Sequence, residues 1–279
     1  LASIDSVRGK VDGRLASLAE ESVRAGASEQ YRTWGDLIYA WLWTIQPGQT
    51  QLDIDGEKIP LDPKKSAKEN AQDYFERYKK GRSAGEHVPE LIEKAQTELR
   101  YLDQLGLQIA QAQAFPDIEA LSAEWDRYRI EHNVGGMQKG ARLRKPGPGR
   151  RVRPLFDDEG NAVYIGRNGA QNDEVTFDIA GPNDTWLHAR GVPGSHVIIR
   201  WRNPAGDERD ETIEAAAQLA GYYSSLRNGG QAEVDVTRRR FVRKIKGTGP
   251  GMVTYRNERT IAVRPAGEEA LTATLTPAN

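Results

Sequence analysis

Two narrow apolar stripes with helical spacing, set far apart in the chain, constrain the fold more than any other feature. In each stripe apolar residues recur every three or four positions, the spacing of one face of a helix. The first contains Ile4, Val7, Val11 and Leu18, interrupted at Arg14, and the second contains Val88, Leu91, Ala95, Leu102, Leu105 and Ile109, interrupted at Glu98. Charged residues flank both stripes. Two such helices predict an intramolecular antiparallel coiled coil, with two ordinary helices of a bundle as the alternative.

The insert between the stripes, about residues 30–82, predicts a small helical knob. A wide apolar face includes Tyr31, Trp34, Leu37, Ile38, Trp41, Leu42 and Ile45. Pro47 and Gly48 end that helix, and Asp55-Gly56 has the composition of a hairpin turn. Ser66 and Glu69 then form a capping box at the start of the next helix. We expect the aromatic side chains of the insert to pack against one another rather than to form a ligand cage.

The pattern changes after a further predicted helix, about 117–131. Residues 135–153 are rich in Gly, Pro, Lys and Arg and predict a flexible basic linker. From Pro154, short β-branched runs alternate with turns, and one amphipathic helix at about 211–226 interrupts them. The predicted strands are 163–166, 175–179, 186–189, 196–201, 232–236, 241–245, 252–255 and 260–263.

These patterns predict an α+β protein: an antiparallel coiled-coil stalk with a knob, followed by a mostly antiparallel sheet domain with one main helix. The predicted parts are the stalk and knob at 1–134, the basic linker at 135–153, the sheet domain at 154–265, and a loose tail at 266–279.

Composition excludes several classes of protein and points to a polyanion as partner. No apolar run approaches the roughly 20 residues that span a membrane, and with no cysteine the chain has neither disulfides nor thiolate metal sites. Residues 1–137 contain 17 Lys/Arg and 23 Asp/Glu, whereas residues 138–265 contain 22 and 15. This asymmetry is typical of a chain in which only one part meets a polyanion such as RNA or DNA, and a solvated surface of mixed charge is the alternative. The missing cysteines favour the cytoplasm.

The segment 183–200 is the most distinctive stretch of the sheet domain. Val192-Pro193-Gly194 predicts a turn between two strands, in which Pro193 presets φ and Gly194 accepts a positive φ. Such a turn brings together Asp184, Trp186, His188, Ser195 and His196. Backbone N–H groups near Gly194 are candidates for phosphate contact. Packing is the main alternative role for these side chains, and we expect Trp186 to lie in the core.

The sheet domain resembles the NFACT-R domain of the NFACT family, the RqcH and fibronectin-binding-protein-A-like factors of ribosome quality control. The resemblance rests on Gly166-Arg167-Asn168, on Asp184-x-Trp186-x-His188 followed by Pro193-Gly194-Ser195-His196, and on Lys246-Gly247-x-Gly249-Pro250-Gly251. The first half is similar to the family's coiled-coil and middle region through Ile59-Pro60-Leu61-Asp62-Pro63 and Tyr74-Phe75-x-x-Tyr78-Lys79-Lys80.

The resemblance implies a C-terminal fragment of a bacterial protein, without the family's NFACT-N and helix-hairpin-helix domains. In this family the whole protein binds a stalled large ribosomal subunit that still holds peptidyl-tRNA, and it recruits alanyl-tRNA to add an alanine tail. The implied partners are therefore ribosomal RNA, a ribosomal protein and tRNA, with no membrane. The resemblance implies no catalytic residue, metal or cofactor, and the fragment alone should not support tailing.

Basic residues supply the candidate RNA contacts, because Lys and Arg neutralise phosphates and release counterions. The candidates are Arg190, His196, Arg200, Arg238, Arg239, Arg240, Arg243, Lys244 and Lys246. If 241–245 is a strand, alternation places Arg239 and Arg243 on one face and Arg240 and Lys244 on the other. The pattern favours recognition of RNA shape and backbone over sequence-specific readout.

Two other functions compete with this interpretation. A surface adhesin for fibronectin is implied by the older family name, but the sequence has no export signal, disulfide framework or repeats. An enzyme using Asp184, His188, Ser195 and His196 as an acid–base or nucleophilic set is the other alternative. Cell fractionation of the full-length protein distinguishes the adhesin from an RNA-binding module. Hydrolytic turnover or bound zinc would distinguish the enzyme from such a module.

Overall fold

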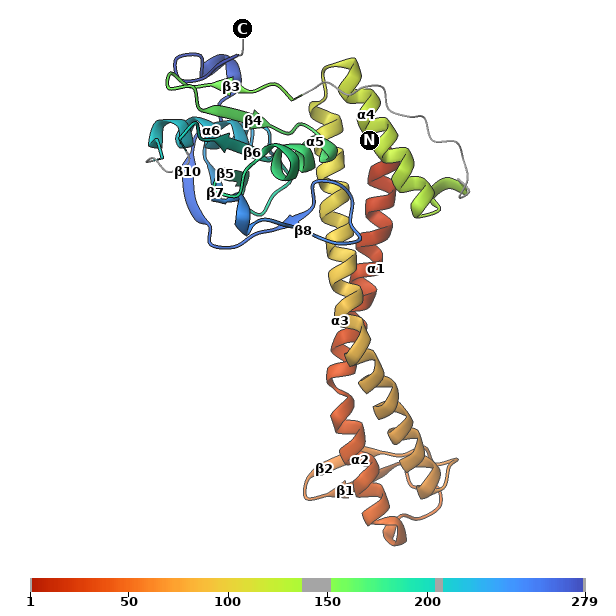
Figure 1. Ribbon diagram of the computed structural model, residues 1–279. Helices are drawn as coiled ribbons and strands as arrows, with labels where there is room; N and C mark the ends of the chain where they lie inside the picture. Colours follow the sequence, from red (N-terminus) through yellow and green to blue (C-terminus); the bar gives the residue numbers. More distant parts are fainter. Residues whose placement is uncertain (1, 137–151, 204–207, 278–279) are drawn as a thin grey trace. The chain divides into compact units, whose positions relative to one another are not determined.

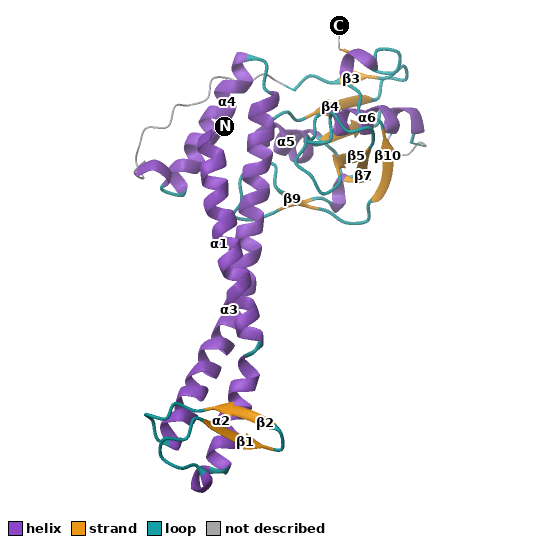
Figure 2. Cartoon of the chain, turned by 180° about the vertical axis from the view of Figure 1, so that it is seen from behind, coloured by secondary structure: helices purple, strands orange, loops and turns teal. Residues whose placement is uncertain are grey.

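The computed structural model describes residues 2–136, 152–203 and 208–277 (Figure 1, Figure 2). The chain divides into two compact units. The knob unit is Gly9–Thr97, and the sheet unit combines Leu1–Arg8 with Glu98–Asn279. Helices α1 (Ala2–Gly26) and α3 (Ala67–Gln111) each contribute to both units. The predicted boundaries at residues 134 and 154 stay predictions.

The two long helices pair in antiparallel fashion, as the apolar stripes predict. In the sheet unit, Ile4 Cγ2 lies 4.0 Å from the Cβ position of Gly106; in the knob unit, Ala25 Cβ lies 4.0 Å from that of Gly85. From Ile4 to Ala25 the residue number on α1 rises by 21, and the number of the facing residue on α3 falls by 21, from Gly106 to Gly85. Apolar residues of both stripes are buried, namely Ile4, Val7, Val11, Val88, Ala95, Leu102 and Leu105. The predicted coiled coil is therefore confirmed.

The knob unit contains α2 (Ser28–Ala40), a 3-10 turn at Leu42–Thr44, and a hairpin of β1 (Gln51–Ile54) and β2 (Glu57–Pro60). Asp55 and Gly56 have φ of 50° and 86°, as a tight hairpin turn requires. The capping box is present, because Ser66 N donates to Glu69 Oε2 at 2.7 Å and Glu69 N donates to Ser66 Oγ at 3.3 Å.

The small core of the knob unit forms where the hairpin meets α2 and α3. Its buried apolar residues are Ile38, Leu52, Ile59, Leu61, Ala71 and Tyr74. Trp34 packs edge-on against Tyr74, with 5.3 Å between ring centroids. Trp41 departs from the expected apolar face, because α2 ends at Ala40 and its ring is left 42% exposed. Trp43 is 76% exposed.

The sheet unit contains a seven-stranded antiparallel sheet in the order β10-β7-β5-β6-β4-β3-β11. The strands are β3 (Leu155–Phe156), β4 (Ala162–Ile165), β5 (Thr185–Ala189), β6 (Val197–Arg200), β7 (Ala232–Arg238), β10 (Arg259–Val263) and β11 (Thr276–Pro277). Helix α6 (Asp210–Tyr222) covers one face and buries Ile213, Leu219 and several alanines against it. The α+β class is therefore confirmed.

A helical segment, not the predicted strand 175–179, covers part of the opposite face. Helix α5 (Gly169–Asp173) continues into a π-helical turn, Glu174–Ile179. Asn168 caps the start of α5 by accepting from Gln171 N at 2.8 Å. Val175 is fully buried in a second core cluster with Trp186, Ile198 and Val242. The β-branched composition misled the prediction, because burial against the sheet outweighs local propensity.

The expectation of a loose tail at 266–279 is wrong for the described residues up to Pro277. A 3-10 turn at Glu268–Ala270 leads to β11, which pairs with β3. Leu271 and Leu275 are 8% and 1% exposed and join the core under α6. Burial of these two leucines holds the tail on the domain.

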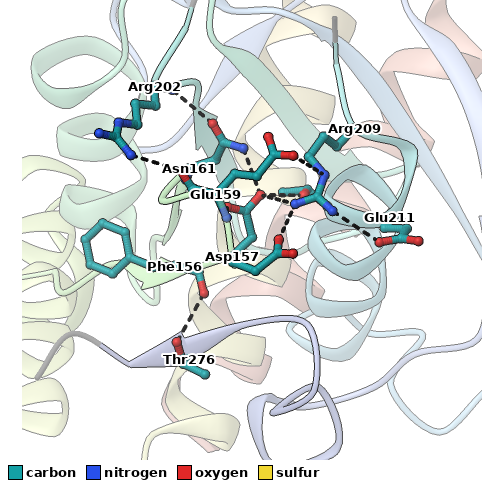
Figure 3. A network of polar contacts seen from close by, with 10 residues as sticks. Phe156, Asp157, Glu159, Asn161, Arg202, Arg209, Glu211 and Thr276 are labelled. Atoms are coloured by element: carbon teal, nitrogen blue, oxygen red, sulfur yellow. Dashed lines mark hydrogen bonds and ion pairs between the residues drawn. The ribbon is translucent and has the colours of Figure 1, made fainter.

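A polar network joins the turn between β3 and β4 to the start of α6 (Figure 3). Asp157 accepts hydrogen bonds from Asn161 N at 2.8 Å and from Thr212 Oγ1 at 2.7 Å. Arg209 Nη1 lies 3.7 Å from the same carboxylate. Burial opposes ionisation of Asp157, but the hydrogen bonds outweigh it and lower its pKa. The ionised carboxylate thereby fixes where α6 begins.

Glycines allow the loop between β8 (Arg243–Lys244) and β9 (Val253–Thr254) to lie against α3, and the start of α5 to lie against α4 (Phe115–Glu131). A Cβ on Gly249 would overlap the ring of Tyr101. A Cβ on Gly169 would come within 2.8 Å of Glu124 Oε1. These two glycines therefore permit a close approach of backbone to side chains within the sheet unit.

Candidate nucleic-acid interface

The distinctive segment 183–200 forms β5, a turn and β6, but its glycines act differently from expectation. Gly191 has a φ of 67°, whereas Gly194 does not have a positive φ. Gly194 forms a bridge with Ser224, and the neighbouring Ser195 N donates to Tyr223 O at 3.1 Å. Gly194 is buried, so its predicted role in phosphate contact is wrong. Gly191 is the exposed glycine of this turn.

Trp186 and the two histidines form a packed aromatic cluster. Trp186 is fully buried, as predicted, and His196 is 1% exposed. Their ring centroids lie 5.2 Å apart, and His188 stacks on Trp186 at 5.6 Å. Burial lowers the pKa of His188 to about 4 and that of His196 well below its usual value. Both rings are therefore neutral near pH 7, and the assignment of His196 as an RNA contact is wrong because its ring cannot reach a phosphate.

Asp184 and Ser195 are also buried, at 5% and 3% exposure. Asp184 accepts from Gly181 N at 2.7 Å and so closes the turn before β5. His196 Nδ1 lies 2.9 Å from Thr176 Oγ1. Within the described ranges no hydrogen bond joins the Ser195 hydroxyl to either imidazole. These motif residues hold the architecture of the domain together.

The three consecutive arginines lie at the end of β7 and in a 3-10 turn (Arg239–Phe241), not on one continuous strand. Arg238 Nη1 lies 2.7 Å from Glu208 Oε1. Arg239 Nε donates to Thr176 O at 2.8 Å, and Arg240 Nη1 donates to Asn183 Oδ1 at 2.7 Å. Since all three bind protein groups, they first stabilise the domain, and the predicted alternation of faces is wrong.

The next basic residues divide into bonded and free cations. Lys244 Nζ lies 2.6 Å from Asp173 Oδ2, so its charge is already paired. Arg243 and Lys246 are exposed and have no acidic partner within 4 Å among the residues that the structure describes. Of this predicted cluster, these two side chains are the best placed for phosphate contact.

Further exposed cations lie nearby in the sequence or on neighbouring strands. Arg190 reaches from the end of β5 to β10, where its Nη1 donates to Thr260 Oγ1 at 2.8 Å. We call the exposed cations without an acidic partner in the described part of the sheet domain the exposed basic set. It comprises Arg190, Arg200, Arg202, Arg240, Arg243, Lys246, Arg256, Arg259 and Arg264. Sequence reasoning missed Arg202, Arg256, Arg259 and Arg264; the last two directly flank the predicted strand 260–263.

The whole net positive charge of residues 138–265 comes from the segment before the folded domain. Residues 138–153 contain seven Lys/Arg and no Asp/Glu, whereas residues 154–265 contain 15 of each. The predicted basic linker falls mainly on residues 137–151, outside the described residues. The domain itself is therefore neutral overall, and several of its acidic residues gather around a single arginine rather than beside the exposed basic set. This arginine, Arg209, lies within 4 Å of Asp157 and Glu159.

Two further features bear on the class of protein. None of the helices in the described ranges is both long and apolar enough to cross a membrane. The same ranges hold no group of three or more His, Asp or Glu side chains arranged for a metal ion.

Known proteins share both halves of this architecture. The chain is 34% identical to the Rqc2 homolog RqcH of Bacillus subtilis over 256 residues, 88% of this chain and 43% of the relative. It is 31% identical to the Rqc2 homolog RqcH of Streptococcus suis, over 92% of this chain and 46% of the relative. The chain thus spans less than half the length of these curated relatives.

A solved structure with a similar fold is the C-terminal part of the fibronectin/fibrinogen-binding protein from Streptococcus suis. Its TM-score is 0.72 at 27% identity, covering 98% of this chain and 95% of the solved chain. The fold that this chain shares with the solved structure joins paired helices to an α+β domain. Residues 3–137 match the family model for NFACT N-terminal and middle domains, and residues 152–257 match that for the NFACT protein RNA binding domain. The chain belongs to the NFACT family.

Proposed function

We propose that this chain is the RNA-binding module of a bacterial, cytoplasmic ribosome-quality-control factor. The observation that carries the proposal is the match of residues 152–257 to the NFACT RNA-binding domain. The exposed basic set and the seven cations of residues 138–153 supply charge for phosphate contacts. The module acts by binding, without a catalytic residue or cofactor.

The proposed partners are the stalled large ribosomal subunit and tRNA. Binding to ribosomal RNA and to a ribosomal protein would hold the factor on the subunit. In a full-length protein this module would then support C-terminal alanine tailing of the nascent chain. The support for this assignment is similarity to RqcH proteins, of which the chain covers 43–46%.

The test measures binding of the chain to tRNA and to large subunits over a range of salt concentrations. Affinity should fall steeply as salt rises, because phosphate contacts release counterions. The double variant Arg243→Ala/Lys246→Ala should reduce the slope of log affinity against log salt by about two, without a lower melting temperature. The control, Lys10→Ala/Arg24→Ala, removes two exposed charges from α1 and should leave the tRNA slope unchanged. A flat salt response, or no binding at low salt, contradicts the proposal.

Fibronectin binding is the second candidate, because the Streptococcus suis protein of similar fold is named for it. Binding of the chain to immobilised fibronectin, compared with its binding to ribosomes, distinguishes the two functions. Saturable binding to fibronectin without binding to ribosomes would favour the adhesin. The RNA-binding proposal expects the reverse.

A further inference from the structure

Strands β5, β7 and β10 lie side by side at one edge of the sheet, and a chain of hydrogen bonds joins all three (Figure 1). Arg190, which follows β5, donates through Nη1 to Thr260 Oγ1 at 2.8 Å. Thr260 Oγ1 in turn donates to Asp235 Oδ1 at 2.6 Å. The other oxygen of Asp235 accepts from Tyr255 Oη at 2.8 Å. The chain of bonds therefore runs from an exposed cation to a buried carboxylate.

Asp235 is the fixed end of this chain of bonds. It is 2% exposed, and in the sheet register it lies between Thr260 of β10 and His188 of β5. Burial lowers the pKa of His188 to about 4, so this neighbour is neutral near pH 7. Since both oxygens of Asp235 accept hydrogen bonds, the hydroxyl hydrogen of Thr260 points into the domain. The hydroxyl oxygen is thereby left to accept from Arg190.

Arg190 keeps unused donors and open space around it. A guanidinium carries five N–H donors, and within the described ranges its side chain makes a hydrogen bond only to Thr260. Glu233, an exposed acid of β7, forms no ion pair with it there. Arg190 and the next residue, Gly191, are both exposed, and apart from chain neighbours no atom lies within 4 Å of the Cβ position of Gly191. A phosphate can therefore approach this guanidinium from solvent.

The anchor of Arg190 differs from those of other arginines in the exposed basic set. Arg202 and Arg243 donate to backbone carbonyls at 3.4 Å, and Arg240 donates to the amide oxygen of Asn183. As far as the structure describes this set, only Arg190 is held by a side chain that itself binds a buried carboxylate. A guanidinium that is already held loses less conformational entropy when it binds a phosphate.

We propose that Arg190 contacts one backbone phosphate of the RNA, and that Thr260 and Asp235 are positioning residues that hold its guanidinium in place. An arginine edge binds a phosphate through two parallel N–H bonds, a geometry that depends on its orientation. This inference rests on the proposed RNA-binding function and deepens it. It assigns one phosphate contact to the end of β5, and it makes an uncharged side chain, Thr260, a determinant of RNA affinity.

Binding of the chain to tRNA over a range of salt concentrations distinguishes charge from position. Arg190→Ala should lower the slope of log affinity against log salt by about one, because one phosphate contact is lost. Thr260→Val keeps the charge of Arg190 and the shape of residue 260 but removes the hydroxyl. It should lower affinity about 2- to 12-fold at every salt concentration, the cost of ordering one long side chain on binding, without changing the slope. Thr260→Ser retains a hydroxyl and should bind like the wild type.

A double-mutant cycle identifies the residue through which Thr260 acts. In the Arg190→Ala background, Thr260→Val should cause no further loss of tRNA affinity. A purely structural role would instead weaken binding equally in both backgrounds and lower the melting temperature. Thr276→Val is the matched control, because it removes an exposed threonine hydroxyl from the other edge strand, β11, where it donates to Phe156 O at 3.3 Å. This control should bind like the wild type.

Two results would overturn the positioning role while RNA binding stands. One is an equal loss from Thr260→Val in both backgrounds, and the other is a salt slope that Arg190→Ala leaves unchanged. The Arg190→Ala measurement is decisive even if Thr260→Val fails to fold, since the Arg190 side chain is exposed. Failure of the wild-type chain to bind tRNA at low salt would contradict the proposed RNA-binding function, and the positioning role with it.

Discussion

Replacing Glu124 by Gln should make the stability of the sheet unit less dependent on pH. Glu124 lies on α4 and is 8% exposed, with Tyr101 Oη donating to its Oε1 at 3.1 Å. Burial is the main cause that raises the pKa of Glu124 from 4.5 to about 7. The hydrogen bond from Tyr101 and the charge of Arg127 favour ionisation and oppose this rise, whereas the charge of Asp173 adds to it.

The magnitude follows from that difference in pKa. A shift from 4.5 to about 7 corresponds to about 3 kcal/mol at 1.36 kcal/mol for each tenfold change in proton affinity. The folded state binds this proton more tightly than the unfolded state does. The stabilisation is therefore complete below pH 4.5 and disappears as pH rises through 7. Glu124→Gln should match the wild type near pH 4.5 and exceed its stability by up to about 3 kcal/mol at pH 8.

Amide hydrogen exchange of α4 and of the β8–β9 loop, followed from pH 5 to pH 8, measures the local opening free energy. The variant should lose less protection than the wild type as pH rises. The control is Glu131→Gln on the same helix, whose side chain is exposed; it should follow the wild type. Identical pH profiles for wild type and Glu124→Gln would refute the assignment of Glu124 as a buried proton-binding group.

Three further substitutions test the packing. Trp186→Ala should destabilise the sheet unit by about 3–5 kcal/mol, measured by urea unfolding, because it empties a fully buried site. Asp157→Ala should cost about 2–4 kcal/mol and lower the melting temperature, since Thr212 and Arg209 lose their common partner; a change below 0.5 kcal/mol would contradict the network's role. Gly249→Ala should cost about 1–3 kcal/mol through the clash with Tyr101, whereas Gly247→Ala, with open space around its Cβ position, should show only the strain of its φ of 75°.

Several residues of the family motif that were expected to contact RNA instead stabilise the domain. His196 and Gly194 were expected to meet RNA, yet both are buried. Arg239 and Lys244 were expected to contact RNA. Because they bind Thr176 and Asp173, their loss should also lower the melting temperature. Spacing in a sequence identifies a domain without separating residues that build it from residues that it exposes.

The sequence by itself determined the elements that depend on neighbours in the chain. The coiled-coil stripes, the capping box at Ser66 and the Asp55-Gly56 hairpin all follow from local spacing and turn chemistry, and the structure contains each. Only the tertiary structure decided that 175–179 is helical, that Leu275 enters the core, and which cations remain unpaired. Those outcomes depend on burial and on acidic partners far away in the sequence, such as Glu208 for Arg238. Burial and ion pairing depend on which residues become neighbours in three dimensions. Local sequence patterns do not carry that information.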